Sequence, residues 1–330
     1  MALRLTTRES VMQLNATQVQ DALPWNALIP ALKEIFTRDV CSPVRHHHTL
    51  EVAQAPNATL LLMPAWLENE YLGVKQVNVF PGNNAFNIPG LSSHYMLSCG
   101  KTGQPLAQLD GNELTARRTA AASALASQFL SRDDASELLM VGAGRMGRRL
   151  IPAHMSVRPI KRVHVWDRNQ AAAETLVTEL QAAGIDAFIC AKDQLEMAAK
   201  QADIISCATM STSPLILGDW LKPGAHLDLV GSFTPSMRET DNAAMQNCAV
   251  FVDTRAGALS ETGDLIMPID QGAMTADAIL AEFSELCSGQ HAGRSDLKQP
   301  NQAITLFKSV GDSREDLAAA ILAYRTQSQA

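Results

Sequence analysis

The segment 142–147 carries the strongest chemical signal in this sequence. It reads Gly142-Ala143-Gly144-Arg145-Met146-Gly147, follows directly on the apolar run 138–141, which predicts a buried strand, and opens a predicted helix. In such a loop the first glycine makes a tight turn, the second lets backbone N–H groups approach a pyrophosphate, and the third lets the helix pack closely on the strand. The helix N-terminus then favours the phosphate charge. The segment therefore predicts a dinucleotide-binding loop.

Asp167 and Arg168, at the end of the next predicted strand, bear on which dinucleotide binds. Asp167 lies twenty residues after Gly147, where an acid can accept hydrogen bonds from the adenosine ribose hydroxyls. That position favours NADH. Arg168 can pair with a 2′-phosphate or stack on adenine, which favours NADPH. Both NADH and NADPH therefore stay candidates.

Further cofactor contacts are predicted where other strands of the same domain end. Cys207 lies in a predicted strand at 204–208 and is expected to pack near the nicotinamide. A nucleophilic role is not expected, because no activating base accompanies the thiol. The other predicted contacts are Ala208, Thr209, Val230, Gly231, Ser232, Val310 and Gly311.

The elements that must position this loop alternate between strands and helices from Ser136 onward. Predicted strands at 137–141 and 162–166 are each followed by a predicted helix, at 147–156 and 170–183. This alternation is typical of a parallel, doubly wound sheet of the Rossmann type, so we predict the α/β class. Further short strands are predicted at 187–191, 204–208, 226–230, 250–252 and 304–307.

The front part of the chain has a different texture. Residues 8–39 are predicted to be helical at both ends, with breaks at Asn15 and Pro24. From Cys41 to Leu109, short apolar runs separated by Pro, Gly and Asn predict a mainly antiparallel sheet. Ala-rich stretches predict a long helix at 113–130 and a last helix in the tail. A smaller α+β domain is therefore expected beside the Rossmann-type domain. Its clearest strands are predicted at 59–63, 72–79 and 93–98.

Length and composition set the outer bounds of the prediction. A chain of 330 residues with 46% hydrophobic and 18% charged residues has the material for two packed domains. Its net charge of −7 gives no electrostatic reason to expect nucleic acid or an anionic membrane as partner. The first residues lack the apolar run of a signal peptide, and no apolar stretch has the length of a membrane span. Because none of the six cysteines forms a C-x-x-C pair, we expect a cytoplasmic protein with reduced thiols.

Several motifs together resemble the ornithine cyclodeaminase/μ-crystallin family. The glycine-rich loop is one, and the others are Leu114-Thr115-Ala116-Arg117-Arg118-Thr119-Ala120-Ala121, Phe307-Lys308-Ser309-Val310-Gly311, Pro43-Val44-Arg45 and Gly73-Val74-Lys75. They occur in the family's order over nearly the whole chain. The resemblance implies a homodimer in which the sheet domain, completed by the C-terminal helix, carries the dimer contact and the substrate pocket. We expect residues 1–118 with 312–330 to form this domain, and 119–311 to form the cofactor domain.

The family's substrate-holding pattern maps onto Arg45, Lys75 and Arg118. The same residue types make chemical sense without the family. The carboxylate of an amino or imino acid is planar and anionic, and guanidinium groups bind it by paired, charge-assisted hydrogen bonds. A lysine in a closed pocket can add charge or move a proton. The family's Arg-Thr-Ala-Ala register selects Arg118, so Arg117 is expected to be a charge on the helix face.

One departure from the family pattern bears on the reaction. The ornithine cyclodeaminases that this chain resembles have a Gly-Gly-Asp-x-Pro segment. At the corresponding place this chain has Gly231-Ser232-Phe233-Thr234-Pro235. Phe233 can neither take a proton nor bind an amine, so ornithine cyclisation with loss of ammonia is not expected. Asp228 lies out of register for that role and is expected to be structural or near the cofactor. The segment 231–239 resembles family members that reduce cyclic imines.

The expected reaction is reduction of Δ1-pyrroline-2-carboxylate to L-proline, or of Δ1-piperideine-2-carboxylate to L-pipecolate, with NADH or NADPH. Arg45, Arg118 and Lys75 would fix the carboxylate, and Lys75 or a bound water would protonate the imine nitrogen. An alanine-type amino-acid dehydrogenase, an ornithine cyclodeaminase and a μ-crystallin-like NADP-dependent binding protein stay open as alternatives. No metal is expected, because the adjacent His46, His47 and His48 cannot all face one ion.

Overall fold

The computed structural model describes residues 10–329, and the chain divides into two compact units. The first unit comprises the chain up to Ala31, Arg38–Arg117 and the residues from Ser313 onward. The second comprises Leu32–Thr37 and Arg118–Asp312. The division falls inside α3 (Gly111–Leu130), the long helix that the sequence predicts.

The first unit is built on a six-stranded sheet in the order β1-β6-β5-β4-β3-β2. Neighbouring strands are antiparallel except β1 and β6, which are parallel. The strands are Met12–Leu14 (β1), His46–Leu50 (β2), Ala58–Leu67 (β3), Tyr71–Val79 (β4), Leu91–Cys99 (β5) and Pro105–Asp110 (β6). The helices of this part of the chain are Ala16–Ala22 (α1), Trp25–Ile35 (α2) and Ser313–Ser328 (α11).

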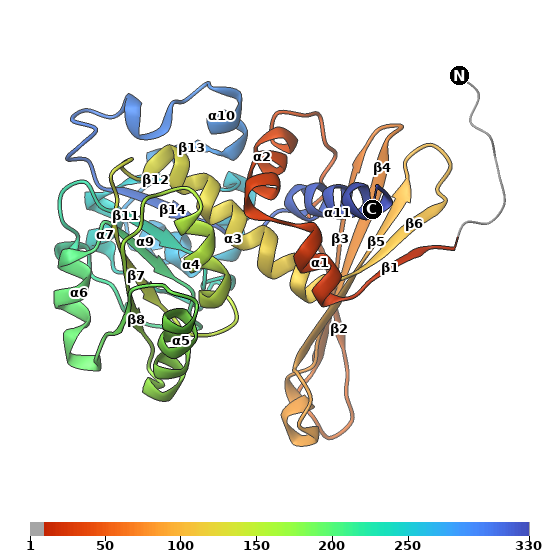
Figure 1. The fold of residues 1–330 in the computed structure, drawn as a ribbon, viewed down its shortest axis with the longest axis horizontal. Helices are drawn as coiled ribbons and strands as arrows, with labels where there is room; N and C mark the ends of the chain where they lie inside the picture. Colours follow the sequence, from red (N-terminus) through yellow and green to blue (C-terminus); the bar gives the residue numbers. More distant parts are fainter. Residues whose placement is uncertain (1–9, 330) are drawn as a thin grey trace. The chain divides into compact units, whose positions relative to one another are not determined.

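Helix α11 covers one face of this sheet, packing across β3, β4, β5 and β6 (Figure 1). Side chains alternate between the two faces of a strand. On β3 and β4 the buried set includes Met63, Ala65, Lys75 and Val77, while their neighbours along each strand are only half-buried. Because Lys75 meets α11, the buried set lies on the α11 face.

The N-terminal helix prediction is wrong over part of its length. Met12–Leu14 is a strand, and the predicted helical residues 8 and 9 lie outside the described residues. Asn15 does mark a break, because it caps α1: its side chain accepts a hydrogen bond from the Gln18 N–H at 3.0 Å within a capping box. The backbone of β1 pairs with β6, far along the chain, and local helix propensity carries no information about such a partner.

The second unit is an eight-stranded parallel sheet in the order β13-β12-β14-β11-β10-β7-β8-β9. The run β9-β8-β7-β10-β11-β14 has the doubly wound order of a dinucleotide-binding domain, which confirms the predicted fold class. The strands are Glu137–Val141 (β7), Arg162–Trp166 (β8), Ala187–Ile189 (β9), Ile204–Cys207 (β10), His226–Leu229 (β11), Ala249–Val252 (β12), Ile279–Glu282 (β13) and Thr305–Lys308 (β14). The helices are Gly147–Met155 (α4), Gln170–Ala182 (α5), Leu195–Gln201 (α6), Asn242–Asn247 (α7), Arg255–Glu261 (α8), Gly263–Asp270 (α9) and Phe283–Ser288 (α10).

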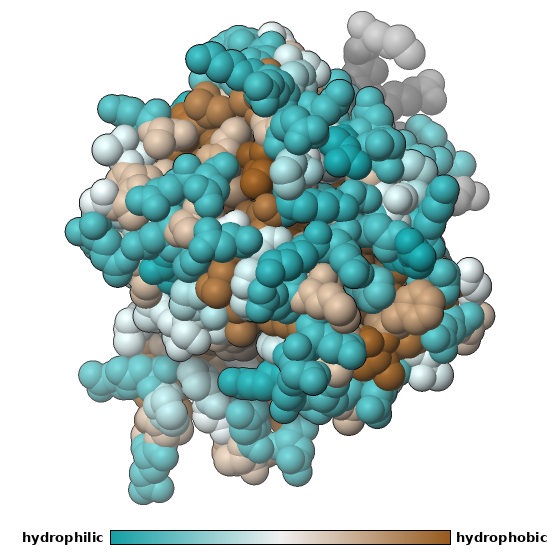
Figure 2. Space-filling view, turned by 90° about the vertical axis from the view of Figure 1, so that its left-hand side faces the viewer, coloured by the Kyte–Doolittle hydropathy of each residue, from teal (hydrophilic) through white to brown (hydrophobic). Residues whose placement is uncertain are grey.

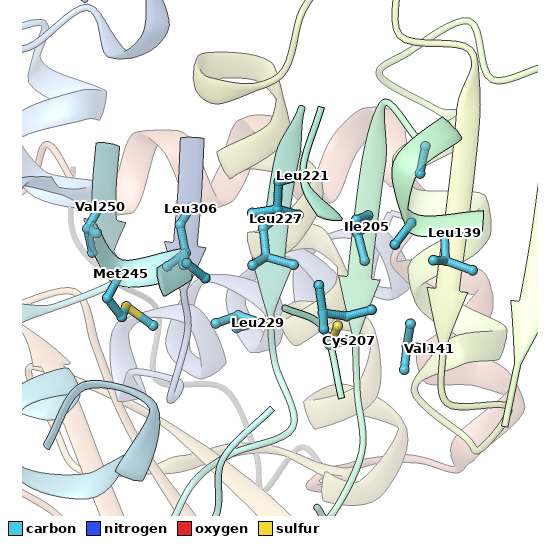
Figure 3. Packing of buried hydrophobic residues seen from close by; sticks show 14 of the residues in the cluster. Leu139, Val141, Ile205, Cys207, Leu221, Leu227, Leu229, Met245, Val250 and Leu306 are labelled. Atoms are coloured by element: carbon cyan, nitrogen blue, oxygen red, sulfur yellow. The ribbon is translucent and has the colours of Figure 1, made fainter. Parts of the chain in front are cut away.

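The core of the second unit follows from burial of its sheet on both faces. Figure 3 shows Leu139, Ile205, Leu227 and Leu306 from neighbouring strands packed in one layer, all fully buried. Strands buried on both faces have near-continuous apolar sequences, which is why short apolar runs predicted them. The face seen in Figure 2 is by contrast a mosaic of hydrophilic residues and separate apolar patches, as exposed surfaces commonly are. Within residues 10–329, no helix has both the length and the apolarity to cross a membrane.

Candidate active site

The glycine-rich loop joins β7 to α4 at the carboxyl end of a central strand. Gly142 has φ +115°, and a Cβ there would lie 2.6 Å from the carbonyl oxygen of Ala208. A Cβ on Gly147 would lie 2.3 Å from the carbonyl oxygen of Gly142. Gly144 is exposed, and a Cβ there would meet no atom within 4 Å. Packing therefore dictates two of the glycines, while Gly144 leaves an open stretch of backbone that a pyrophosphate can approach.

The start of α4 offers backbone N–H groups toward the same opening. Met146 is the N-cap residue, and its side chain makes no capping hydrogen bond. The N–H groups of Arg149 and Leu150 already donate to the carbonyl oxygen of Met146 at 2.9 and 2.8 Å, so an anion would be bound by the N–H groups before them and favoured by the helix dipole. Arg145 is exposed. Arg148 braces the loop, because its Nη1 donates to the carbonyl oxygen of Ala143 at 2.8 Å.

Asp167 also holds the loop in shape. Its Oδ2 accepts a hydrogen bond from the Ala143 N–H at 2.7 Å, and its Oδ1 accepts one from the Asn169 N–H at 2.8 Å. A carboxylate has about four lone-pair sites, so these contacts leave room for a ribose hydroxyl. Asp167 is half-buried and Arg168 is exposed, so the geometry accommodates both of the predicted adenosine contacts.

The ends of β10 and β11 are joined by Glu239, which sequence reasoning missed. Glu239 is fully buried; its Oε1 accepts hydrogen bonds from the N–H and hydroxyl of Thr209 at 2.7 and 2.8 Å, and its Oε2 accepts one from the Gly231 N–H at 2.7 Å. A Cβ on Gly231 would lie 2.1 Å from the carbonyl oxygen of Thr209. Burial, together with the charge of Asp264, raises the pKa of Glu239 to about 7. Glu239 thus fixes two loops predicted to contact the cofactor.

A second buried acid and a buried lysine belong to the same polar network as Glu239. Asp264 accepts a hydrogen bond from the Glu239 N–H at 2.7 Å, and the Lys308 Nζ lies 3.3 Å from the Asp264 carboxylate. Lys308 also donates to the carbonyl oxygen of Leu229 at 3.2 Å. All three charged side chains are fully buried. The ends of β10, β11 and β14 are therefore tied together by one polar network.

The remaining residues predicted to contact the cofactor differ in whether they are buried or accessible. Cys207 packs in the apolar core (Figure 3), and burial raises the pKa of its thiol well above the usual value. The Ser232 hydroxyl donates to the carbonyl oxygen of Met237 at 2.7 Å. The side chains of these two residues are thus used inside the protein. Residues that keep an accessible surface are Ala208, Thr209, Val230, Gly231 and Val310.

The segment after β14 positions Arg118. Asp253 is fully buried, and its Oδ2 accepts hydrogen bonds from the N–H groups of Val310 and Gly311, both at 2.7 Å. Gly311 has φ +86°, and a Cβ there would lie 2.4 Å from Nη1 of Arg118. The guanidinium group therefore packs directly on the glycine, which explains why a glycine stands at this position in the motif.

The expectation for Arg117 is wrong. Arg117 is buried, its Nε and Nη2 donate to the carbonyl oxygen of Leu23 at 2.9 and 2.6 Å, and its guanidinium group lies 4.1 Å from the centre of the Trp25 ring. Leu23 is the C-cap residue of α1, whose last carbonyl groups have no partner within the helix. Arg117 is therefore a structural residue inside the first unit and not a charge on an exposed face.

Lys75 and Arg45 lie in different surroundings within the first unit. Lys75 is in β4, is 2% exposed, and has its Nζ 2.7 Å from the Oδ2 of Asp316 in α11. Asp316 lies outside the motifs that the sequence offers. Arg45 is half-buried in the connection before β2. His46, His47 and His48 form the exposed start of β2, and no cluster of metal-binding side chains occurs among residues 10–329.

Asp228 lies at the centre of a buried network in the second unit. Its Oδ2 accepts a hydrogen bond from the Ser206 hydroxyl at 2.7 Å and lies 3.2 Å from Nε2 of His154, whose Nδ1 lies 2.9 Å from the Ser127 hydroxyl. Burial acts to raise the pKa of Asp228, but the hydrogen bond with His154 lowers it overall. Serine, histidine and aspartate also form hydrolytic sites, but here every member is fully buried, so the network is structural.

Comparison with known proteins adds to this geometry. The profile of the ornithine cyclodeaminase/mu-crystallin family matches residues 8–330. This chain belongs to that family. A Delta(1)-pyrroline-2-carboxylate reductase of Colwellia psychrerythraea is 37% identical to this family member over 311 residues, which cover 93% of this chain and 96% of the relative.

Solved structures match the fold over nearly its whole length. The Delta(1)-pyrroline-2-carboxylate reductase of Thermococcus litoralis, in complex with NADH and L-proline, has a TM-score of 0.86 and 30% identity, covering 97% of this chain and 98% of that one. An archaeal alanine dehydrogenase dimer with bound NAD has a TM-score of 0.86 and 25% identity, covering 97% and 96%. The resemblance to the family that the sequence motifs indicate is thus confirmed.

Proposed function

We propose that this protein reduces Δ1-pyrroline-2-carboxylate to L-proline with NADH or NADPH. The observation that carries the proposal is the match, over 97% of the chain, to a reductase that holds NADH and L-proline, in a protein with an open glycine-rich loop. Phe233 adds to it. Its side chain is 53% exposed and stands at the position where the cyclodeaminases have an aspartate. The chain therefore lacks the acid that ornithine chemistry uses.

The reaction needs a hydride, a proton and a fixed carboxylate. The nicotinamide supplies the hydride to the imine carbon, and the imine nitrogen takes one proton, so that imine, reduced cofactor and proton give proline and oxidised cofactor. We assign the carboxylate to Arg45 and Arg118, whose guanidinium groups can bind it through paired hydrogen bonds. Lys75 is assigned as the donor of the proton. The loop 142–147 and the ends of β10, β11 and β14 are assigned to the dinucleotide.

A substrate panel tests this function. Purified protein is mixed with NADH or NADPH and, in turn, with Δ1-pyrroline-2-carboxylate, Δ1-piperideine-2-carboxylate, or pyruvate with ammonia. Absorbance at the reduced-cofactor band is followed. We expect steady oxidation with a cyclic imine, and no ammonia above background from L-ornithine and NAD. Tight cofactor binding without turnover on any of these substrates would instead indicate a binding protein.

An alanine-type dehydrogenase is the second candidate function. It is favoured by the archaeal alanine dehydrogenase, which matches this fold with the same TM-score as the reductase. Both reactions need a carboxylate clamp and a hydride, so the residues named above serve either. Faster cofactor oxidation with pyruvate and ammonia than with Δ1-pyrroline-2-carboxylate would favour the dehydrogenase.

Cofactor preference is tested through the two adenosine-facing residues. Asp167→Asn removes the charge that repels a 2′-phosphate and keeps an oxygen for the Ala143 N–H, and Arg168→Ala removes a cation that attracts the 2′-phosphate. If the chain prefers NADPH, Arg168→Ala raises its KM about tenfold or more and leaves the KM for NADH within about twofold. If NADH is preferred, Asp167→Asn has the larger effect.

We also propose that two copies of the chain form a homodimer through the sheet face opposite α11. Register neighbours Pro64, Val74 and Met96 form an apolar row across three strands on that face, and all three are half-buried. A row of this kind suits a symmetric contact between identical sheets. Light scattering after gel filtration is expected to give twice the chain mass for wild type. For Val74→Lys we expect the mass of a single chain. No disulfide joins any of the six cysteines within residues 10–329, which suits a reducing compartment, and we place the protein in the cytoplasm.

A further inference from the structure

The ion pair between Lys75 and Asp316 is unusual because both of its side chains are buried. The Lys75 side chain is 2% exposed and that of Asp316 is 0% exposed, and the Nζ lies 2.7 Å from the Oδ2. The two residues come from β4 and from the first turn of α11. A buried pair of this kind contributes little net stability compared with apolar residues of similar size, because both charges lose their hydration. Stability alone is therefore a weak reason for these two residues to meet.

The surroundings of the pair include a buried phenol. Tyr95 is the register neighbour of Lys75 on β5, and it lies over Gly73, where a Cβ would be 1.9 Å from its hydroxyl oxygen. The hydroxyl is fully buried and has no hydrogen-bond partner among the described residues. Burial and the negative charge of Asp316 raise the pKa of Tyr95 well above its usual value. On β3 the register neighbour of Lys75 is the apolar Met63.

The groups around the ammonium thus include an acid from α11, a neutral phenol from β5 and an apolar side chain from β3. We propose that Asp316 is a positioning residue, which fixes the Lys75 ammonium group in place and keeps it charged so that it can serve as proton donor. This inference rests on the proposed reduction of an imino acid. It adds Asp316, and the α11 helix that carries it, to the parts of the chain on which turnover depends.

The charged state of a buried amine depends on the groups around it. Removal from water disfavours an ammonium ion, whereas a carboxylate within hydrogen-bond distance favours it. In the reaction, Lys75 gives one proton to the imine nitrogen while the imine carbon receives the hydride. The Lys75 side chain, now a neutral amine, takes a proton back from solvent before the next turnover. Asp316 holds the Nζ throughout and exchanges no atoms. Without the carboxylate, Lys75 would spend less time charged and would lose its fixed direction.

The test compares Asp316→Asn, Lys75→Gln and the double variant with wild type. We expect Asp316→Asn to lower kcat on Δ1-pyrroline-2-carboxylate at least about tenfold. The alkaline limb of its kcat–pH profile should move to lower pH, and Asp316→Glu should recover part of the loss. The dissociation constant for NADH should stay within about twofold. Glu70→Gln is the matched control, because it breaks the exposed ion pair with Arg38 in the same unit, and it should leave both quantities unchanged.

The double variant shows whether Asp316 acts through Lys75. If it does, adding Asp316→Asn to Lys75→Gln changes kcat by less than about twofold. An additional loss as large as in the single variant would overturn the proposal, as would an unmoved pH profile with only a lower Tm. Should Asp316→Asn fail to fold because it leaves a buried charge uncompensated, Lys75→Gln and the double variant still decide, since neither contains an unpaired ammonium.

A spectroscopic readout separates this proposal from the proposed function. In protein labelled with ¹⁵N-lysine, the signal missing from Lys75→Gln identifies the Lys75 ammonium, and we expect it to be shielded from solvent exchange in wild type and not in Asp316→Asn. Equal exchange in both proteins would overturn the role of Asp316. The measurement needs no turnover, so it holds even if the substrate panel excludes imine reduction.

Discussion

In the second unit the buried carboxylates of Glu239 and Asp253 bind backbone amides, whereas in the first unit the buried carboxylate of Asp316 lies within hydrogen-bond distance of an ammonium group. Glu239 accepts N–H groups from the ends of two strands, and Asp253 accepts two more from the segment that supports Arg118. Asp316 has the Lys75 Nζ at 2.7 Å. An acid that binds amides fixes the shape of a loop, and an acid that binds an ammonium controls a charge. The two kinds of carboxylate should therefore affect different steps.

The largest expected effect on cofactor binding comes from Glu239→Ala. This change leaves the N–H groups of Thr209 and Gly231 without their acceptor, and each charge-assisted hydrogen bond contributes about 1.5–3 kcal/mol. We expect the dissociation constant for NADH to rise about a hundredfold, as measured by quenching of protein fluorescence. Asp316→Asn should leave that constant nearly unchanged.

The control for this prediction is Glu196→Ala, which removes an exposed acid paired with Lys200 in the same unit. Exposed pairs contribute little to stability, so NADH should bind as in wild type. Unchanged NADH binding by Glu239→Ala would contradict the division of roles, because the amide-bound acid would then have no part in shaping the cofactor loops.

Adjacent arginines on α3 allow a sharper version of the comparison. Arg118→Lys keeps the charge but loses the planar fork proposed to grip the substrate carboxylate, and we expect kcat/KM to fall about tenfold with little change in Tm. Arg117→Lys loses one or both hydrogen bonds to Leu23 and the contact with Trp25, and we expect it to cost roughly 1–2 kcal/mol of stability while kcat/KM is retained. Thermal melts and steady-state kinetics on both variants separate the two outcomes. The reverse result would show that Arg117 holds the substrate.

The sequence predicts the cofactor loop better than the buried charges because the two depend on different distances along the chain. The strand, the loop 142–147 and the following helix are contiguous, so spacing alone identifies them. Glu239 and Asp316 are isolated acids in the sequence, and their roles arise only where Thr209 and Lys75 are brought to them. The exposed position predicted for Arg117 fails for the same reason. Its partners, Leu23 and Trp25, lie far earlier in the chain.

Gly73 tests how tightly the environment of Lys75 is packed. A Cβ at this position would lie 1.9 Å from the Tyr95 hydroxyl and 2.5 Å from its ring, so Gly73→Ala must displace the tyrosine. We expect a loss of about 2 kcal/mol in the free energy of unfolding, measured by urea denaturation, because overpacking a tight core costs energy of that order. In a Tyr95→Leu background the same change should cost less. Equal costs in both backgrounds would mean that the strain lies elsewhere.

The smallest expected effect concerns the pH dependence of stability that Glu239 contributes. Burial raises the pKa of Glu239 to about 7, above its usual value in the unfolded chain. An acid with a raised pKa binds its proton more tightly in the folded state, so its contribution to stability is present at low pH and is lost as the pH rises through about 7. Glu239→Gln cannot titrate, and all other groups are shared, so the difference in unfolding free energy between wild type and variant isolates this contribution. We expect wild type to lose about 1 kcal/mol relative to Glu239→Gln between pH 6 and pH 8, measured by urea denaturation at both values. A difference that stays constant, or that grows in favour of wild type at pH 8, would mean that the amides of Thr209 and Gly231 hold Glu239 ionised throughout. The buried acid would then act as a fixed charge in the second unit, as we propose for Asp316 in the first.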